Sequence, residues 1–200
     1  MYIINRGKNP NGSQRGWLKI RVLRNGEGYK LQYAPISSAT YQELTIAKHA
    51  HHNFSFVSLS GSSVDVEPTK DSWDIAFTTF TNLHQIAATT KIPYGYNDFV
   101  IHNRNEVTVV QVMTAGDMTY ESFDKDDVAG LDFKSAINTI GSSWRIVAQP
   151  GSGQETNVRT DRFYVLNDTD GNIYKFRFTR LLDPVSGDRG YPQLEYELVN

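Results

Sequence analysis

Apolar and polar residues alternate along most of the chain, as they do in strands that bury one face. In 17-WLKIRVL-23 every second residue is Leu, Ile or Val, while Lys19 and Arg21 lie between them. Asn25-Gly26 follows, and then a second alternating run, 29-YKLQY-33. Because Asn-Gly adopts positive φ at little cost, these two runs predict a β-hairpin.

The same pattern predicts a second hairpin near the C-terminus, over 162-RFYVLNDTDGNIYKFRFTRL-181. Its turn lies at residues 167–171, and Tyr174, Phe176 and Phe178 line one face of its second strand. The other strands expected from alternation are Glu43–Ile46, Phe54–Leu59, Val64–Glu67, Trp73–Phe80, Asp98–His102, Val107–Val112, Trp144–Val147 and Gln193–Leu198.

One short helix is expected over Asp132–Ile140, because Phe133 and Ile137 fall on the same side of it. Gly141 is a residue at which such a helix can end. Neither an internal repeat nor a low-complexity linker interrupts the chain. Many strands separated by turns, with one helix, predict a β-dominated, all-β fold.

The composition is that of an ordinary soluble globular protein, with 39% apolar and 21% charged residues. A net charge of −2 and a pI of about 6.2 argue against a nucleic-acid partner, which requires a concentrated basic surface. No apolar run reaches the length of about 18 residues that spans a membrane. The chain has no cysteine, which excludes disulfides, thiolate metal sites and a cysteine nucleophile.

Two segments have residues that are common in metal sites. The stretch 167-NDTDG-171 resembles part of a calcium loop, but Leu166 and Arg177 stand where that loop needs carboxylates. A hairpin turn is therefore the better interpretation. His49 and His51 would share one face of a strand and could hold a divalent ion with one further ligand. Because no second cluster offers that ligand at a diagnostic spacing, a solvent-exposed strand start is the favoured interpretation.

Sequence motifs of common enzyme classes are absent. The chain has no G-x-S-x-G, HExxH, GxGxxG or phosphate-binding loop. The acidic run 124-DKDDVAGLD-132 is interpreted as a surface loop. His84 and His102 are isolated, and each is interpreted as a structural or surface histidine. A hydrolase whose carboxylates are assembled by folding is the weakest of three functional hypotheses.

The segment 107-VTVVQVMTAGDM-118 carries two of the three methionines. Alternation places Met113 on the face of Val107, near the strand end, where packing in the core explains it. Met118 follows the turn at residues 115–117, so a thioether on a loop could instead bind a soft metal such as haem iron or copper(I). Core packing is the favoured interpretation of Met118, and the metal-ligand alternative stays open.

Four features occur in order along the greater part of the chain. They are 71-DSWDIAFTTF-80 with 54-FSF-56 before it, the extended segment 107-VTVVQVM-113, the W-R strand start at Trp144, and the hairpin 163-FYVLNDTDGNIYKFRF-178. Together they resemble the HmuY-type haem-binding lipoproteins over residues 54–196. The resemblance implies antiparallel sheets packed on each other, with haem in a cleft between two axial side chains. On this basis residues 1–200 are one domain, in which an N-terminal extension (1–50) precedes an HmuY-like core (51–200).

The resemblance also implies where haem would bind. A match without gaps places Met118 on the first axial ligand and Gln149 on the second. Since an amide is a weak iron ligand, the second position could instead be vacant or be filled by Met113 or His102. Three tyrosines would supply the apolar walls that a porphyrin needs, namely Tyr94, Tyr96 and Tyr120.

The resulting hypothesis is an exported, surface-associated protein that binds haem or a porphyrin for haem acquisition and is not an enzyme. Members of the family are lipoproteins of the outer membrane or surface of Gram-negative bacteria. We therefore expect this chain to be a mature fragment begun at an added Met1, with membrane contact only through a lipid anchor that it lacks. An outer-membrane transporter is the expected partner. The alternative is a surface module on the same scaffold that has lost haem and recognises a glycan or a protein.

Overall fold

The structure is a computed structural model that describes residues 1–9, 11–148, 151 and 153–199. Strands dominate it, which confirms the predicted all-β class: this part of the chain forms fourteen strands and one three-residue 3₁₀ helix, η1 (Lys125–Asp127). The chain divides into two compact units, Met1–Ser72 (unit 1) and Trp73–Asn200 (unit 2). The prediction of a single domain over residues 1–200 stays a prediction.

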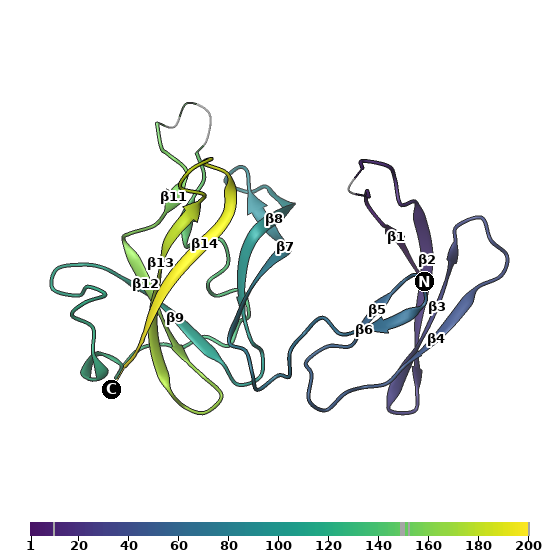
Figure 1. Cartoon of the computed structure of the whole chain (residues 1–200), viewed down its shortest axis with the longest axis horizontal. Helices are drawn as coiled ribbons and strands as arrows, with labels where there is room; N and C mark the ends of the chain where they lie inside the picture. The colour runs from purple at the N-terminus through teal and green to yellow at the C-terminus, as the bar shows by residue number, and fades with distance from the viewer. Residues whose placement is uncertain (10, 149–150, 152, 200) are drawn as a thin grey trace. The chain divides into compact units, whose positions relative to one another are not determined.

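Unit 1 is built on a four-stranded antiparallel sheet whose strands follow one another in chain order (Figure 1). They are β1 (Tyr2–Asn5), β2 (Trp17–Asn25), β3 (Gly28–Pro35) and β4 (Gln42–Ile46). The Asn-Gly hairpin is confirmed, since Asn25 pairs with Gly28 and Gly26 has a φ of 59°. The hairpin is thus where the sequence predicts it, but its turn residues are Gly26 and Glu27, and Asn25 is the last residue of β2.

A separate hairpin completes unit 1. It consists of β5 (Phe56–Ser58) and β6 (Ser62–Val64). The first lies within the expected strand Phe54–Leu59, whereas the second overlaps the expected strand Val64–Glu67 only at Val64. Val57 and Leu59 of this hairpin pack against Leu18, Leu31 and Tyr33 of the larger sheet. These contacts give unit 1 a hydrophobic core of its own.

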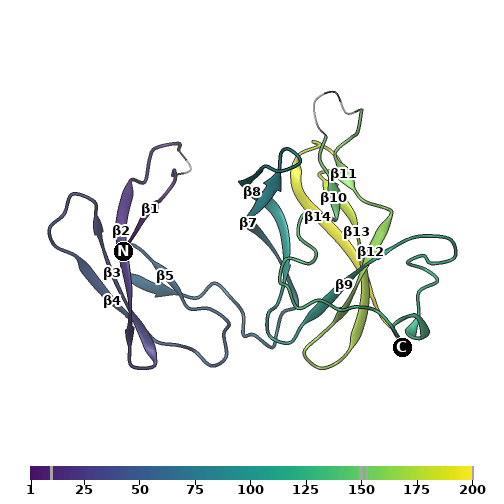
Figure 2. The same cartoon turned by 180° about the vertical axis from the view of Figure 1, so that it is seen from behind.

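Unit 2 contains a four-stranded antiparallel sheet, a long two-stranded ribbon and a short hairpin. The sheet has the order β14-β13-β12-β9 and comprises β9 (Thr108–Met113), β12 (Arg162–Asn167), β13 (Ile173–Leu182) and β14 (Arg189–Leu198). The ribbon pairs β7 (Ile75–Gln85) with β8 (Lys91–His102), and the short hairpin pairs β10 (Arg145–Ile146) with β11 (Asn157–Val158). Figure 2 shows β10 and β11 at the same end of unit 2 as the loop that joins β7 to β8.

The predicted C-terminal hairpin is confirmed as β12 and β13, with Asn167 paired to Ile173. Its turn is held by the side chain of Asp168, whose carboxylate accepts hydrogen bonds from the backbone N–H groups of Asp170 (2.9 Å) and Asn172 (2.7 Å). The acidic residues that resemble a calcium loop thus stabilise a turn, as Asp side chains commonly do.

Both faces of the four-stranded sheet are covered, which explains why β12 reads as an uninterrupted apolar run. On one face lies the central cluster, formed by Val100, Val107, Val109, Ile140, Trp144, Val158, Tyr164, Leu166, Phe176, Phe178 and Leu181. On the other lies the second cluster, formed by Tyr120, Phe123, Phe163 and Val165, with Val110, Val112 and Met118 packed against them. Alternate residues of β9 and β12 therefore serve two different cores.

The helix expected over Asp132–Ile140 does not form, and this prediction is wrong. The backbone of the segment bonds instead to neighbouring strands: Val109 and Lys134 exchange two hydrogen bonds, and the N–H of His102 donates to Ile137 O at 3.0 Å. These partners use the groups that a helix would need for its own i to i−4 bonds. Long-range pairing therefore overrides the local periodicity.

Candidate functional site

Met113 and Met118 belong to opposite faces of the sheet. Met113 continues the face of Val109 in the central cluster, and it ends β9 with 46% of its surface exposed. Its Sδ accepts a hydrogen bond from Gln111 Nε2 at 3.4 Å. Met118 is half-buried against the second cluster. We therefore expect the two thioethers not to bind one iron atom together.

A tight turn fixes the position of Met118. Ala115 and Met118 exchange two backbone hydrogen bonds of 3.1 Å, and Gly116 between them has a φ of 58°. Positive φ at the first central position is the requirement of a type II′ hairpin turn, which Gly satisfies without strain. The predicted loop position of Met118 is thus correct, and its side chain turns back onto the sheet.

The exposed end of β9 lies beside the base of the β10–β11 hairpin. Met113 pairs with Arg162, which follows β11 by four residues, and Thr114 N–H donates to Asp161 O at 2.9 Å. On the same face, Gln111 Oε1 accepts hydrogen bonds from Ser143 Oγ (3.0 Å) and Arg162 Nη1 (3.1 Å). Met113 is therefore close to the segment that follows β11, at the base of the hairpin and not at its loop.

Gln149, the residue matched to the second axial ligand, belongs to that loop and lies outside the described residues. Its pairing with Met118 stays a prediction. The strands that flank the loop are described: Arg145 of β10 pairs with Val158 of β11, and Arg162, which follows β11, pairs with Met113.

Arginines gather at this base. They are Arg145 and Arg189, which form ion pairs with Asp98, and Arg159 and Arg162, which form ion pairs with Asp161. Burial raises the pKa of the Asp98 carboxyl, but the hydrogen bonds and charges of its two arginines outweigh this effect and lower the pKa below its ordinary value. Four cations thus share two carboxylates, which leaves a local excess of positive charge.

The β7–β8 ribbon presents an aromatic face at the same end of unit 2. Its register places His84 on the face of Tyr94 and Tyr96, with ring centroids 5.5 and 6.5 Å away. The ring of Tyr96 in turn lies 6.0 Å from the guanidinium of Arg145. Tyr94 is 50% exposed and His84 is also exposed. The ribbon thus connects an exposed aromatic surface to the group of arginines.

His84, interpreted from the sequence as a structural or surface histidine, is exposed, and its contact with Tyr96 was not predicted. The expected strands stopped at Phe80 and resumed at Asp98, so His84 and Tyr96 fell between them. The available signal was alternation beyond those limits, in Phe80-x-x-x-His84 and in Tyr94-x-Tyr96.

Two other predicted site residues are enclosed. His102 is 1% exposed, and its ring nitrogens lie 3.0 Å from Asn103 O and 2.8 Å from Ala136 O, so neither nitrogen faces open space. Tyr120 is 5% exposed, and burial raises its pKa to about 12. The cations of Lys175 and Arg177 lie 4.9 and 4.4 Å from the centre of its ring. Neither residue offers a surface to a porphyrin in this conformation.

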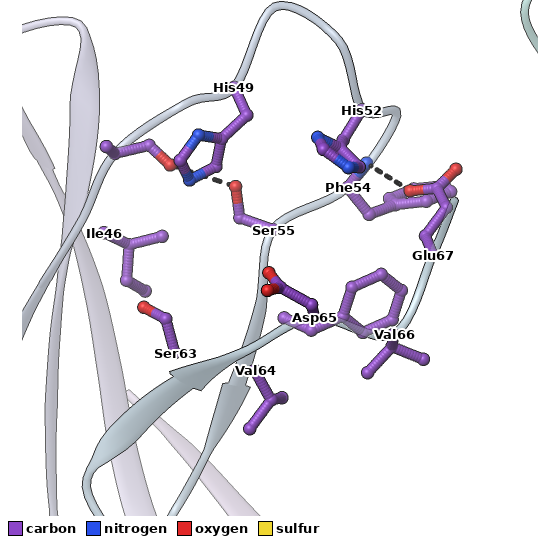
Figure 3. Close-up of a pocket in the computed structure, with 12 residues that line it drawn as sticks. Ile46, His49, His52, Phe54, Ser55, Ser63, Val64, Asp65, Val66 and Glu67 are labelled. Carbon is purple, nitrogen blue, oxygen red and sulfur yellow. Dashed lines mark hydrogen bonds between the residues drawn. The ribbon is translucent and has the colours of Figure 1, made fainter. Parts of the chain in front are cut away.

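The histidine cluster of unit 1 borders a small pocket of about 70 Å³ (Figure 3). The rings of His49 and His52 contact edge to face at 6.1 Å, and Glu67 accepts a hydrogen bond from Phe54 N–H at 3.0 Å. Within residues 1–9, 11–148, 151 and 153–199, no three His, Asp or Glu side chains are arranged to hold a metal ion. The volume is far below the several hundred Å³ of a typical cofactor site.

A larger apolar pocket of about 390 Å³ lies on the central-cluster side of the sheet in unit 2, lined by Asp74, Ile75, Leu166, Tyr174, Phe176, Leu194 and Tyr196. Burial and the charges of Asp168 and Asp170 raise the pKa of Asp74. This pocket therefore combines apolar walls with negative charge, which is unfavourable for the two propionates of haem.

No helix in the described part of the chain is long and apolar enough to cross a membrane. Comparison with known proteins gives one finding: the family model described as "HmuY protein" matches residues 50–196. No curated protein and no solved structure matches the chain. The match spans most of the chain and reaches from β7 into β14 of unit 2, and with the all-β fold it shows that this protein belongs to the HmuY family.

Proposed function

We propose that this protein binds haem or a related porphyrin at the cell surface, takes part in haem acquisition and does not catalyse a reaction. Membership of the HmuY family, which is associated with haem binding, supports the proposal. The observation that carries it is the exposed thioether of Met113, which pairs with Arg162, one of four arginines that share two carboxylates. A thioether is a suitable axial ligand for haem iron, and cations can pair with the two propionates.

The residues at this end of unit 2 fit such a group. The side chain of Arg145 is 9% exposed, and its Nε is buried without a hydrogen-bond partner in the described part of the chain. Buried donors are nearly always satisfied, so an acceptor on a ligand would complete this one. Tyr96 lies against the same guanidinium and would supply an apolar wall.

Met113 is the thioether that we expect to reach iron, because it is exposed on the face that carries the β10–β11 base. Met118, which the family resemblance favours, is the alternative and would have to leave the second cluster to expose its sulfur. Gln149 remains a proposed contributor from the adjoining loop. Whichever of these side chains binds the iron would hold and orient haem, and no bond of the haem would be broken.

A haem titration tests the function directly. Ferric and ferrous haem added to the protein should give a saturable shift of the Soret band. Met113→Leu keeps an apolar side chain of similar volume but removes the sulfur, and it should weaken binding by about tenfold or more. Met118→Leu is the matched variant and should change binding little.

The opposite ranking of the two variants would transfer the axial role to Met118. If both variants bind haem as tightly as the unaltered protein does, methionine ligation is excluded and haem binding stands. A titration of the unaltered protein that is indistinguishable from free haem would overturn the proposed function.

The second candidate function is recognition of a glycan or a protein after loss of haem. The exposed apolar side chains of the ribbon favour it, since Tyr94 (50%), Leu83 (59%) and Ile92 (40%) present apolar surface to solvent. Binding of soluble oligosaccharides in the absence of haem, measured by the quenching of tyrosine and tryptophan fluorescence, would support it.

Location at the cell surface, and delivery of haem to an outer-membrane transporter, are parts of the same proposal. Labelling of intact cells with an antibody against the protein tests the first. Labelling that requires permeabilised cells would contradict a surface location.

A further inference from the structure

His84 has the geometry of a histidine that is prepared to bind a metal. Its Nδ1 lies 3.1 Å from the hydroxyl oxygen of Tyr96, which fixes the ring on the aromatic face of the ribbon. Its side chain is exposed, and no partner for Nε2 is found in the described part of the chain. Metal-binding histidines are commonly held in this way, with one ring nitrogen hydrogen-bonded and the other directed at the metal.

The hydrogen bond is compatible with the tautomer that ligation needs. When Nδ1–H donates to the Tyr96 oxygen, Nε2 carries the lone pair that can bind iron. When the Tyr96 hydroxyl donates instead, the proton sits on Nε2. Metal binding would select the first arrangement, in which Tyr96 orients the imidazole without itself touching the metal.

No other histidine of unit 2 can take this role in the conformation described. Unit 2 contains two histidines, and His102 is buried with both ring nitrogens at carbonyl oxygens. His84 is thus the one imidazole that this unit presents to solvent. Imidazole is a stronger ligand for haem iron than an amide and is at least as common as a thioether.

The surroundings of His84 suit a flat, apolar, dianionic ligand. Tyr94 and Tyr96 lie within 5.5 and 6.5 Å of the imidazole and are themselves in edge contact at 4.8 Å. Tyr96 contacts Arg145, which belongs to the group of arginines with excess positive charge. A porphyrin whose iron is above His84 could therefore stack on tyrosine and direct its carboxylates toward cations.

We propose that His84 Nε2 is an axial ligand of the haem iron and that Tyr96 is its positioning residue. The inference rests on the proposed haem-binding function, and it replaces the ligand pair implied by the family resemblance with one that includes an imidazole. His84 donates a lone pair to iron, and no electron or group is transferred.

Spectroscopic titration of the full chain with ferric haem tests this assignment. His84→Ala should weaken binding by at least about tenfold and move the Soret band and the electron paramagnetic resonance signals toward those of weaker axial ligation. Free imidazole added to the His84→Ala protein should restore the original spectrum. His51→Ala, a change of an exposed histidine in unit 1, is the matched control and should leave the titration unchanged.

Tyr96→Phe separates positioning from ligation. It keeps the ring but removes the hydrogen bond, so it should weaken haem binding by up to about tenfold without changing the set of axial ligands seen in the spectrum. Circular dichroism identical to that of the unaltered protein would confirm that the variants fold.

The outcomes distinguish this inference from the proposed function. Saturable haem binding whose spectra are the same in the unaltered and His84→Ala proteins would overturn the role of His84 and leave the function standing. Absence of haem binding by the unaltered protein would overturn both.

Discussion

Lys175 is a cation buried in the sheet of unit 2. Its side chain is 8% exposed, and its ammonium donates hydrogen bonds to the carbonyls of Tyr120 (2.8 Å) and Phe123 (3.0 Å) while pairing with Glu197 at 3.1 Å. Alternation along β13 places Lys175 opposite the aromatic residues, which is correct. It does not reveal that the loop after β9 covers this second face, because that contact joins residues more than 50 positions apart.

Lys175→Met should destabilise unit 2 by roughly 2–4 kcal/mol, because it leaves two enclosed carbonyls without a donor. Urea unfolding monitored by circular dichroism measures the change. Lys134→Met removes a cation whose partner, Asp132, is largely exposed, and it should have no measurable effect. Equal losses in the two variants would contradict this account of Lys175.

The pH dependence of stability should report on Asp98. The pKa of this carboxyl is lowered in the folded protein, so its ionised form stabilises the fold above the unfolded-state pKa of about 3.9, and that contribution is lost as the pH falls through the lower folded value. Asp98→Asn should therefore flatten the decline of stability below about pH 4 and cost roughly 3 kcal/mol at neutral pH. Urea unfolding at a series of pH values tests both effects; an unchanged acid profile would argue against the Arg145–Asp98–Arg189 group.

At the scale of elements, the features that depend on residues adjacent in the sequence could be predicted. The β2–β3 and β12–β13 hairpins follow from Asn25-Gly26 and from the Asp-rich turn, whose signals are local. The segment 132–140 was mispredicted because its apolar spacing suits a helix, while its backbone pairs with β8 and β9. The contact of His84 with Tyr94 and Tyr96 was not predicted for a related reason: it depends on the register of two strands, which no single strand reveals.

Gly141 is the residue that allows this segment to join β8. It has a φ of 60° and exchanges backbone hydrogen bonds with Val100, and an added Cβ would lie 3.1 Å from Asn138 O and 3.3 Å from the Phe99 ring. Gly141→Ala should destabilise unit 2 by about 1 kcal/mol or more, through both strain and crowding. Gly95→Ala, in open space on β8, is the control and should cost less, as measured by thermal unfolding.

At the scale of the whole molecule, each unit has its own core. Leu31 and Tyr33 belong to unit 1, whereas Phe163 and Trp144 belong to unit 2. The sequence predicted an N-terminal extension that contains a hairpin, followed by an HmuY-like core. The division between the units depends on which strands share a core, and that is decided by packing.

Leu31→Ala should cost roughly 2–5 kcal/mol of stability in unit 1 and little in unit 2, because the two cores share no residue. Hydrogen–deuterium exchange should then accelerate in β2 and β3 but not in β12 and β13. Phe163→Ala should give the reverse pattern. Acceleration throughout the chain in either variant would show that the units unfold together.

The β5–β6 hairpin bears on how the protein can be dissected. The family match begins at Ala50, yet Val57 and Leu59 of this hairpin pack on β2 and β3, which precede the match. A fragment cut at residue 50 would carry these two side chains without the surface that shields them, and so would tend to aggregate. A cut after Ser72 separates no side chain from its core. The border of the family match and the border between the two compact units therefore lie at different places in this chain.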